Sequence, residues 1–96
     1  MEYKHIMDQA LEEVHGAKSY AKCAMKYREE DPMKAKKYFD LAQEELRHGD
    51  MLYKMAEEEK RGERTAMERE YMNADRERYA EKLSHVKAML DAFRGA

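Results

Sequence analysis

Two carboxylates and one imidazole have the residue types and the spacing that metal binding requires. Glu45 falls inside the apolar stripe of a helical segment, within roughly 40° of its centre at ~100° per residue, and His48 follows one turn later. Glu13 borders the corresponding stripe of the preceding segment. Because a buried carboxylate must be paired or bound to a metal ion, Glu13, Glu45 and His48 are candidate ligands of a carboxylate-bridged metal site.

The types of donor atom restrict which metal ions could bind. Carboxylate oxygens with one imidazole per ion suit Fe(II), Mn(II) or, less selectively, Zn(II), and no thiolate lies nearby to favour copper or a cluster. A metal-free alternative stays open, in which Glu45 forms a buried ion pair with Lys18, Arg78 or Lys82.

Two tyrosines share a helix face with the candidate carboxylates. Tyr20 lies seven residues after Glu13, and Tyr38 lies seven residues before Glu45. Their phenols could donate hydrogen bonds to the ligand carboxylates. The alternative is that both rings are ordinary core aromatics.

The same Glu-x-x-His spacing occurs twice more, and helix direction separates these copies from the candidate site. Glu12 lies nearly opposite the apolar stripe of the first helix, and His15 is also well off it. Glu2 and His5 fall in the first turn. We expect both pairs to be solvated. His85 follows a lysine instead of a carboxylate at this spacing, so we expect it to be a surface histidine.

Three helices are predicted to position these side chains, over residues 3–29, 32–61 and 66–94. Asp31 can cap the second helix, and Pro32 fits its first position, where no backbone N–H is needed. Thr65 and Glu68 form a capping-box pattern before the third helix.

The short turn at Asp31-Pro32 makes the first two helices antiparallel. Residues whose numbers sum to about 62 then face one another, which brings Glu13 beside the level of His48, with Glu45 one turn away at ~5.4 Å per turn. The three candidate ligands can therefore reach a common point.

The third helix is less regular. Its apolar positions are dense only in the second half, and Asp75, Arg78 and Lys82 interrupt the same face. We expect its first half to lie against polar groups or to be loosely packed.

Composition narrows the class of protein. The chain has 96 residues, 42% charged and 43% hydrophobic, with one proline, which favours one domain of long helices. A core of this size is marginal, so association of chains is expected. The net charge of −2 arises from 19 basic and 21 acidic residues mixed along the chain, which indicates neither nucleic acid nor membrane as a partner. Cys23 is the single cysteine, and no apolar leader or spanning segment is evident, so a cytoplasmic location is expected.

With these residues in place, the chain resembles the first half of a ferritin-like di-iron protein. Glu13 with Gly16 and Tyr20 is followed, after a helix turn, by the run Ala42-Gln43-Glu44-Glu45-Leu46-Arg47-His48. The likeness is closest to the short encapsulated ferritin and rubrerythrin-like group and covers roughly residues 6–56. Encapsulation by a shell protein is left open, because residues 91–96 do not resemble the docking tail of that group.

The resemblance implies an all-α fold and a shared site. An antiparallel long-helix hairpin plus a third helix would complete a ferritin-like four-helix bundle by dimerisation, as a homodimer or a ring of dimers. Glu13, Glu45 and His48 of each chain would bind a di-iron centre, with Mn or Zn as substitutes, and oxidise Fe(II) with O2 for iron storage or detoxification. Two alternatives of other classes stay open: a metal-free helical protein-interaction module and a structural metal-stapled dimer.

Overall fold

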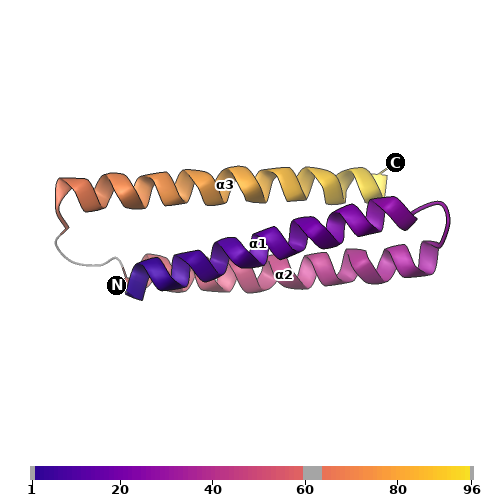
Figure 1. Ribbon diagram of the computed structural model, residues 1–96, viewed down its shortest axis with the longest axis horizontal. Coiled ribbons are helices and arrows are strands. Elements are labelled where there is room, and N and C mark those ends of the chain that lie inside the picture. Colours follow the sequence, from indigo (N-terminus) through magenta and orange to yellow (C-terminus); the bar gives the residue numbers. More distant parts are fainter. Residues whose placement is uncertain (1, 60–63, 96) are drawn as a thin grey trace.

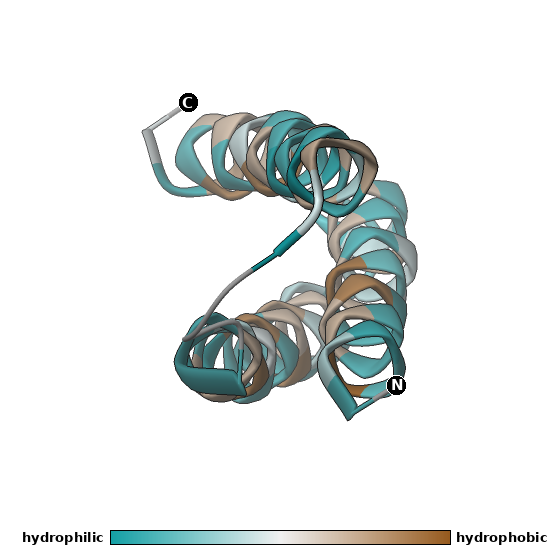
Figure 2. Cartoon of the chain, turned by 90° about the vertical axis from the view of Figure 1, so that its left-hand side faces the viewer, coloured by the Kyte–Doolittle hydropathy of each residue, from teal (hydrophilic) through white to brown (hydrophobic). Residues whose placement is uncertain are grey.

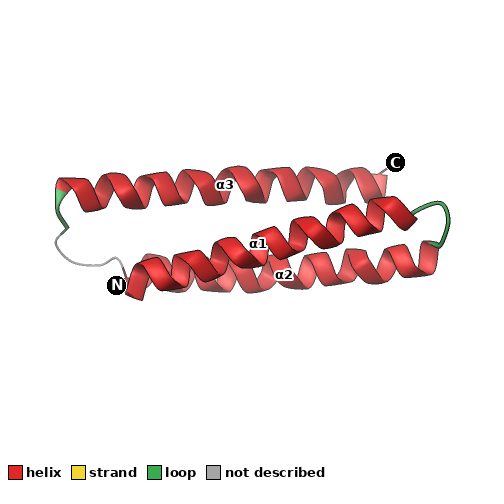
Figure 3. Ribbon diagram, viewed as in Figure 1, coloured by secondary structure: helices red, strands yellow, loops and turns green. Residues whose placement is uncertain are grey.

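A computed structural model describes residues 2–59 and 64–95. Within these residues the chain forms helices α1 (Glu2–Tyr27), α2 (Pro32–Glu59) and α3 (Ala66–Gly95) and no strand (Figure 1, Figure 3). The all-α class and the three helices predicted from the sequence are therefore confirmed. No stretch of the described helices combines the length and the hydrophobicity that crossing a bilayer requires.

The described helix boundaries lie within one residue of the prediction, except at the end of the first helix. α1 ends at Tyr27 and not at Glu29, because residues 28–30 already form the turn. The backbone N–H of Asp31 donates to the Tyr27 carbonyl at 2.9 Å and closes this turn. Pro32 disfavours a helical backbone at the residue before it, so the chain must leave the helix earlier. The predicted end of the second helix, at residue 61, lies outside the described residues.

Both predicted N-terminal caps are present. At the start of α2, Oδ1 of Asp31 accepts a hydrogen bond from the backbone N–H of Lys34 at 3.2 Å. At the start of α3, the N–H of Thr65 donates to Glu68 Oε1 at 3.0 Å, and the N–H of Glu68 donates to Thr65 Oγ1 at 3.1 Å. Hydrogen bonds from the backbone and the side chain of Thr65 lower the pKa of the Glu68 carboxyl. The capping bonds satisfy N–H groups that have no partner within the helix and so fix where each helix begins.

Helices α1 and α2 pack side by side along most of their length (Figure 1). Small side chains fill their contact, which lets the two backbones approach closely. The fully buried small residues of this pair are Ala10, Ala17, Ala21, Ala24, Ala35, Ala42 and Ala56. This close approach brings side chains of α1 and α2 within reach of one another.

Helix α3 lies closer to α1 than to α2 (Figure 2). Large aromatic rings bridge α3 to α2. The rings of Phe39 and Phe93 stack with their centroids 4.9 Å apart, and those of Tyr53 and Tyr79 stack at 4.4 Å. Stacked rings of this kind contribute about 0.5–1.5 kcal/mol beyond the area that they bury. The third helix therefore covers one side of the α1–α2 pair.

The first half of α3 lies against polar groups, which was one of the two arrangements expected from its sequence. Asp75 is 1% exposed and lies 3.5 Å from the ammonium of Lys4 and 3.8 Å from the guanidinium of Arg78. Arg76 donates two hydrogen bonds to the carboxylate of Glu57, at 2.8 and 2.9 Å. A buried carboxylate without cations would be costly. The Lys4–Asp75 pair joins the start of α3 to α1, and the Arg76–Glu57 pair joins it to α2.

Candidate metal centre

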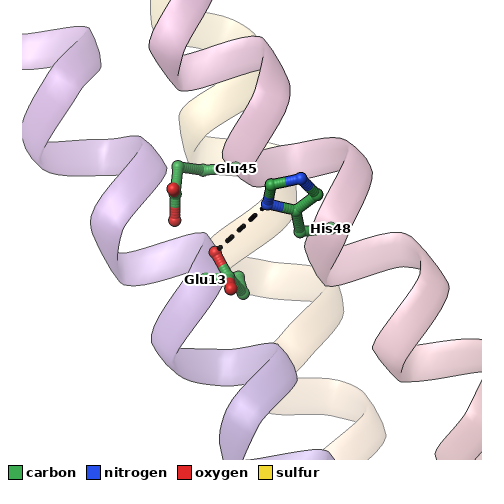
Figure 4. A group of neighbouring side chains, drawn as sticks. All are labelled: Glu13, Glu45 and His48. Atoms are coloured by element: carbon green, nitrogen blue, oxygen red, sulfur yellow. Dashed lines mark ion pairs between the residues drawn. The ribbon is translucent and has the colours of Figure 1, made fainter.

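The three candidate ligands lie together in the groove between α1 and α2. Glu13 comes from α1, and Glu45 and His48 come from α2 (Figure 4). One donor atom from each residue can be chosen so that all three lie within 4.8 Å of one another. The ribbon of α3 passes behind the pair, so the cluster is on the side of α1 and α2 that α3 does not cover (Figure 4). Atoms at this spacing could be bridged by one ion.

A helical glycine lies beside each of the two carboxylates, and one of them, Gly16, makes room for Glu45. A Cβ atom added to Gly16 would lie 3.0 Å from Oε2 of Glu45, so the missing side chain leaves space for that carboxylate against α1. A Cβ atom added to Gly49 would lie 3.5 Å from the Cβ atom of Glu13, so this glycine sits beside the other ligand. The sequence indicated Gly16 only as part of the ferritin-like pattern, and its contact with Glu45 gives it a physical role.

The two carboxylates interact strongly. A hydrogen bond with Glu13 raises the pKa of Glu45, and burial together with the negative charge of Glu13 raises it further, while His48 opposes the shift. Two carboxylates this close repel one another when both are ionised, which makes the ionised form of Glu45 less favourable. A divalent cation in that position would offset this repulsion and allow both groups to ionise.

His48 is positioned without being hydrogen-bonded. Its Nδ1 atom lies 3.9 Å from Oε2 of Glu13, and its Nε2 atom lies 3.9 Å from Oε2 of Glu44. Both separations exceed hydrogen-bond distance. Glu44 is exposed and bonds to Arg47 at 2.6 Å. Neither ring nitrogen of His48 is therefore occupied by a hydrogen-bond partner at these two carboxylates.

The ion-pair alternative for Glu45 is not found among the described residues. No lysine or arginine there lies within 4.0 Å of its carboxylate, and Arg78 is paired instead with Asp75. If the chain were a metal-free protein-interaction module, His48 would be expected to face solvent. The His48 side chain is 46% exposed. The structure therefore agrees with the expected exposure of His48, but not with the expected ion pair of Glu45.

Glu45 is less buried than its place in the apolar stripe predicted. It is half-buried, as is Glu13, whose side chain is 28% exposed. The cause is the position of α3, which covers the opposite side of the α1–α2 pair and leaves this edge of the stripe open (Figure 4). The candidate site is therefore accessible in a single chain.

The alternative Glu-x-x-His pairs lie where helix direction predicted. Glu2, His5, Glu12 and His15 are all exposed, and so is His85. Within residues 2–59 and 64–95, Glu13, Glu45 and His48 form the one group of three or more histidine, cysteine or carboxylate side chains with metal-ligand separations. The three residues chosen from the sequence by their helix face are therefore the ones that lie close together in the structure.

The tyrosines pack against one another instead of against the carboxylates. The Tyr20 and Tyr38 rings have centroids 6.2 Å apart, and Tyr27 stacks on Tyr38 at 5.9 Å. In the described part of the chain neither Tyr20 nor Tyr38 donates a hydrogen bond to Glu13 or Glu45. The core-aromatic interpretation therefore describes both rings, and the stacking partner Tyr27 was not singled out from the sequence.

Replacing Gly16 with alanine should weaken metal binding without weakening the fold. The added Cβ atom would lie 3.0 Å from Glu45 Oε2, so the carboxylate must move. That oxygen is the end of a flexible side chain, whereas alanine is favoured over glycine in a helix by about 0.8–1.0 kcal/mol. We expect a melting temperature of the metal-free protein that is unchanged or higher, and a metal affinity about 10- to 100-fold lower, measured by titration calorimetry with Mn(II).

The matched control is Gly49→Ala, on the facing helix. Its added Cβ atom would meet Val14 Cγ2 at 3.4 Å and Glu13 Cβ at 3.5 Å, which are ordinary van der Waals contacts. This variant should keep its metal affinity. Equal losses of affinity in the two variants would mean that the space beside Glu45 has no special role.

Comparisons with protein families, with curated proteins and with solved structures find no match to this chain. The likeness to ferritin-like proteins therefore rests on the residue pattern and on the geometry of Glu13, Glu45 and His48.

Proposed function

We propose that this protein is a ferritin-like iron-binding protein whose di-iron site is shared between two subunits. The observation that supports the proposal is the convergence of Glu13, Glu45 and His48 on the uncovered side of α1 and α2. Ferritin-like di-iron sites use one Glu from each of two helices and Glu-x-x-His from each of two others. One chain supplies half of this set, and a two-fold axis would supply the rest.

The surface around the candidate metal site has apolar side chains that could pack against a second copy of the chain. Leu41, His48 and Met55 follow at intervals of seven residues and so lie on one face of α2, and Met51 flanks them. Leu41, Met51 and Met55 are 44%, 55% and 48% exposed, so this face of α2 presents large apolar side chains to solvent. In this proposal, the antiparallel hairpin of α1 and α2 pairs with its copy through this face and completes a four-helix bundle, as a dimer or a ring of dimers.

The donor set fits iron as the substrate. Two carboxylates and one imidazole per chain are hard and borderline ligands that accept Fe(II), with Mn(II) and Zn(II) as competitors. The proposed reaction is the transfer of two electrons from two Fe(II) ions to O2, which takes up two protons and leaves as hydrogen peroxide, while the iron becomes Fe(III). Glu13 and Glu45 would neutralise the charge of the ions, and His48 would orient them. In the same proposal, the protein stores or detoxifies iron in the cytoplasm, with or without a surrounding protein shell.

Aerobic oxidation of Fe(II) tests this function. Metal-stripped protein is mixed with Fe(II) without oxygen, then exposed to O2, and the formation of Fe(III) is followed by absorbance. We expect oxidation faster than in buffer alone, a fast phase that saturates near one iron per chain, and inhibition by prior addition of Zn(II). Dimerisation by Zn(II) with no accelerated oxidation would instead establish the metal-stapled dimer.

A further inference from the structure

A second groove runs between α1 and α3, on another side of α1 from the candidate metal centre. Lys18 lies five residues after Glu13, which places it about 140° further around the helix. The groove has a volume of about 590 Å³. It is lined by Lys18, Arg78, Glu81, Lys82, Ser84 and His85. A small cavity of about 20 Å³ adjoins it and is lined by Val14, His15, Lys18, Lys82, His85 and Val86.

Cations from two helices converge on this groove. Lys18 of α1 faces Lys82 and Arg78 of α3, and Glu81 is the one carboxylate in the lining. The lining of this groove is positively charged, although the formal net charge of the whole chain is −2. Among the described residues neither Lys18 nor Lys82 has a carboxylate within 4.0 Å, and the nearest carboxylate of Arg78 is Asp75 at 3.8 Å. An anion in this groove would be attracted by the positive charges of Lys18, Lys82 and Arg78, which line it.

The other groups in the lining favour an oxyanion. Ser84 offers a hydroxyl donor, and His15 and His85 border the same lysines from opposite helices. These histidines do not form a metal-ligand group with Glu81, since the one such group among the described residues is Glu13, Glu45 and His48. Ammonium, guanidinium, hydroxyl and imidazole N–H groups are the donors that bind the oxygens of phosphate.

We propose that the α1–α3 groove is a binding site for a phosphate-class anion, either orthophosphate or pyrophosphate. Lys18 and Lys82 hold the anion from the two sides of the groove, and Arg78 and Ser84 donate to its remaining oxygens. This site is independent of the proposed iron chemistry, because it uses none of the candidate metal ligands.

Calorimetric titration of metal-stripped protein with pyrophosphate, and separately with orthophosphate, tests the site at low ionic strength. We expect saturable binding with a Kd below about 1 mM for at least one of the two anions. The variant Lys18→Gln/Lys82→Gln should bind that anion at least about tenfold more weakly, because it loses two charge-assisted contacts. Absence of saturable binding to the unaltered protein would overturn the proposal.

The matched control is Lys36→Gln/Lys54→Gln, which removes the same charge from α2. These lysines are exposed and pair with Asp40 at 3.3 Å and Asp50 at 3.0 Å. The control should bind as the unaltered protein does, and an equal loss in both double variants would show a diffuse charge effect and overturn the site.

A second measurement uses the unaltered protein and therefore does not depend on how the variants fold. The imidazole NMR signals of His15 and His85 should shift on addition of the anion, and those of the distant, exposed His5 should not. Shifts at His5 that equal those at His85 would contradict the proposal.

Discussion

Glu45→Ala and His48→Ala should each abolish iron binding and the oxidation of Fe(II). Each change removes a donor atom from the cluster that lies within 4.8 Å, and a site with two-fold symmetry loses that donor twice. The two donors that remain in each chain cannot compensate, because they leave most coordination positions to water. Iron bound per chain after desalting, together with the rate of aerobic Fe(III) formation, measures the effect. We expect a rate that equals the rate in buffer alone.

The control for these variants is a pair with the same spacing on the solvated face. Glu12 and His15 are exposed, and neither belongs to the metal-ligand group. Glu12→Ala and His15→Ala should therefore retain full iron binding and oxidation. Loss of oxidation in the Glu12 and His15 variants, with Glu45 and His48 dispensable, would mean that the wrong helix face has been assigned.

Removal of metal should lower the melting temperature substantially. In the proposed dimer, two copies of Glu13 and Glu45 meet at one axis, and Glu13 already raises the pKa of Glu45 within a single chain. A cation removes this repulsion and binds only the folded state, so a hundredfold excess over Kd adds about 2.7 kcal/mol. For a dimer of about 200 residues, each ion bound at this excess corresponds to roughly 5–10 °C in melting temperature. Melting curves of chelated and Mn(II)-loaded protein measure the difference.

The Glu45→Ala variant shows whether that effect arises at the site. Its melting temperature should not respond to Mn(II), because the cluster has lost a ligand. A variant that responds as strongly as the unaltered protein would locate the stabilising metal elsewhere, and identical melting curves for the chelated and loaded protein would favour the metal-free module.

The helices and the meeting of the candidate ligands could be predicted because both depend on local signals. Asp31 and Thr65 cap helices through bonds to residues three positions away, and these bonds are present. Once Asp31-Pro32 fixes the reversal, helix geometry alone brings Glu13 to the level of His48. The error at the end of α1 has the same local origin, since the turn begins at residue 28.

The properties that depend on α3 could not be predicted in this way. Whether Glu45 is covered is decided by the side of the α1–α2 pair on which α3 packs, and no local signal specifies that side. Asp75 illustrates the same limit. It interrupts the apolar pattern of α3, yet it is 1% exposed, and its charge is paired with Lys4, which is distant in sequence and lies 3.5 Å away. The sequence shows a carboxylate at an apolar position of the third helix. Only the tertiary structure identifies the cation that pairs with it.

Native mass spectrometry of protein loaded with Fe(II) in the absence of oxygen tests the shared site most directly, because one spectrum reports both the number of chains and the number of metal ions. The account predicts a dimer, or a multiple of dimers, that carries one iron per chain, and a loss of iron in the Glu45→Ala variant. A monomer at every iron concentration, or an assembly that carries no iron, would contradict it.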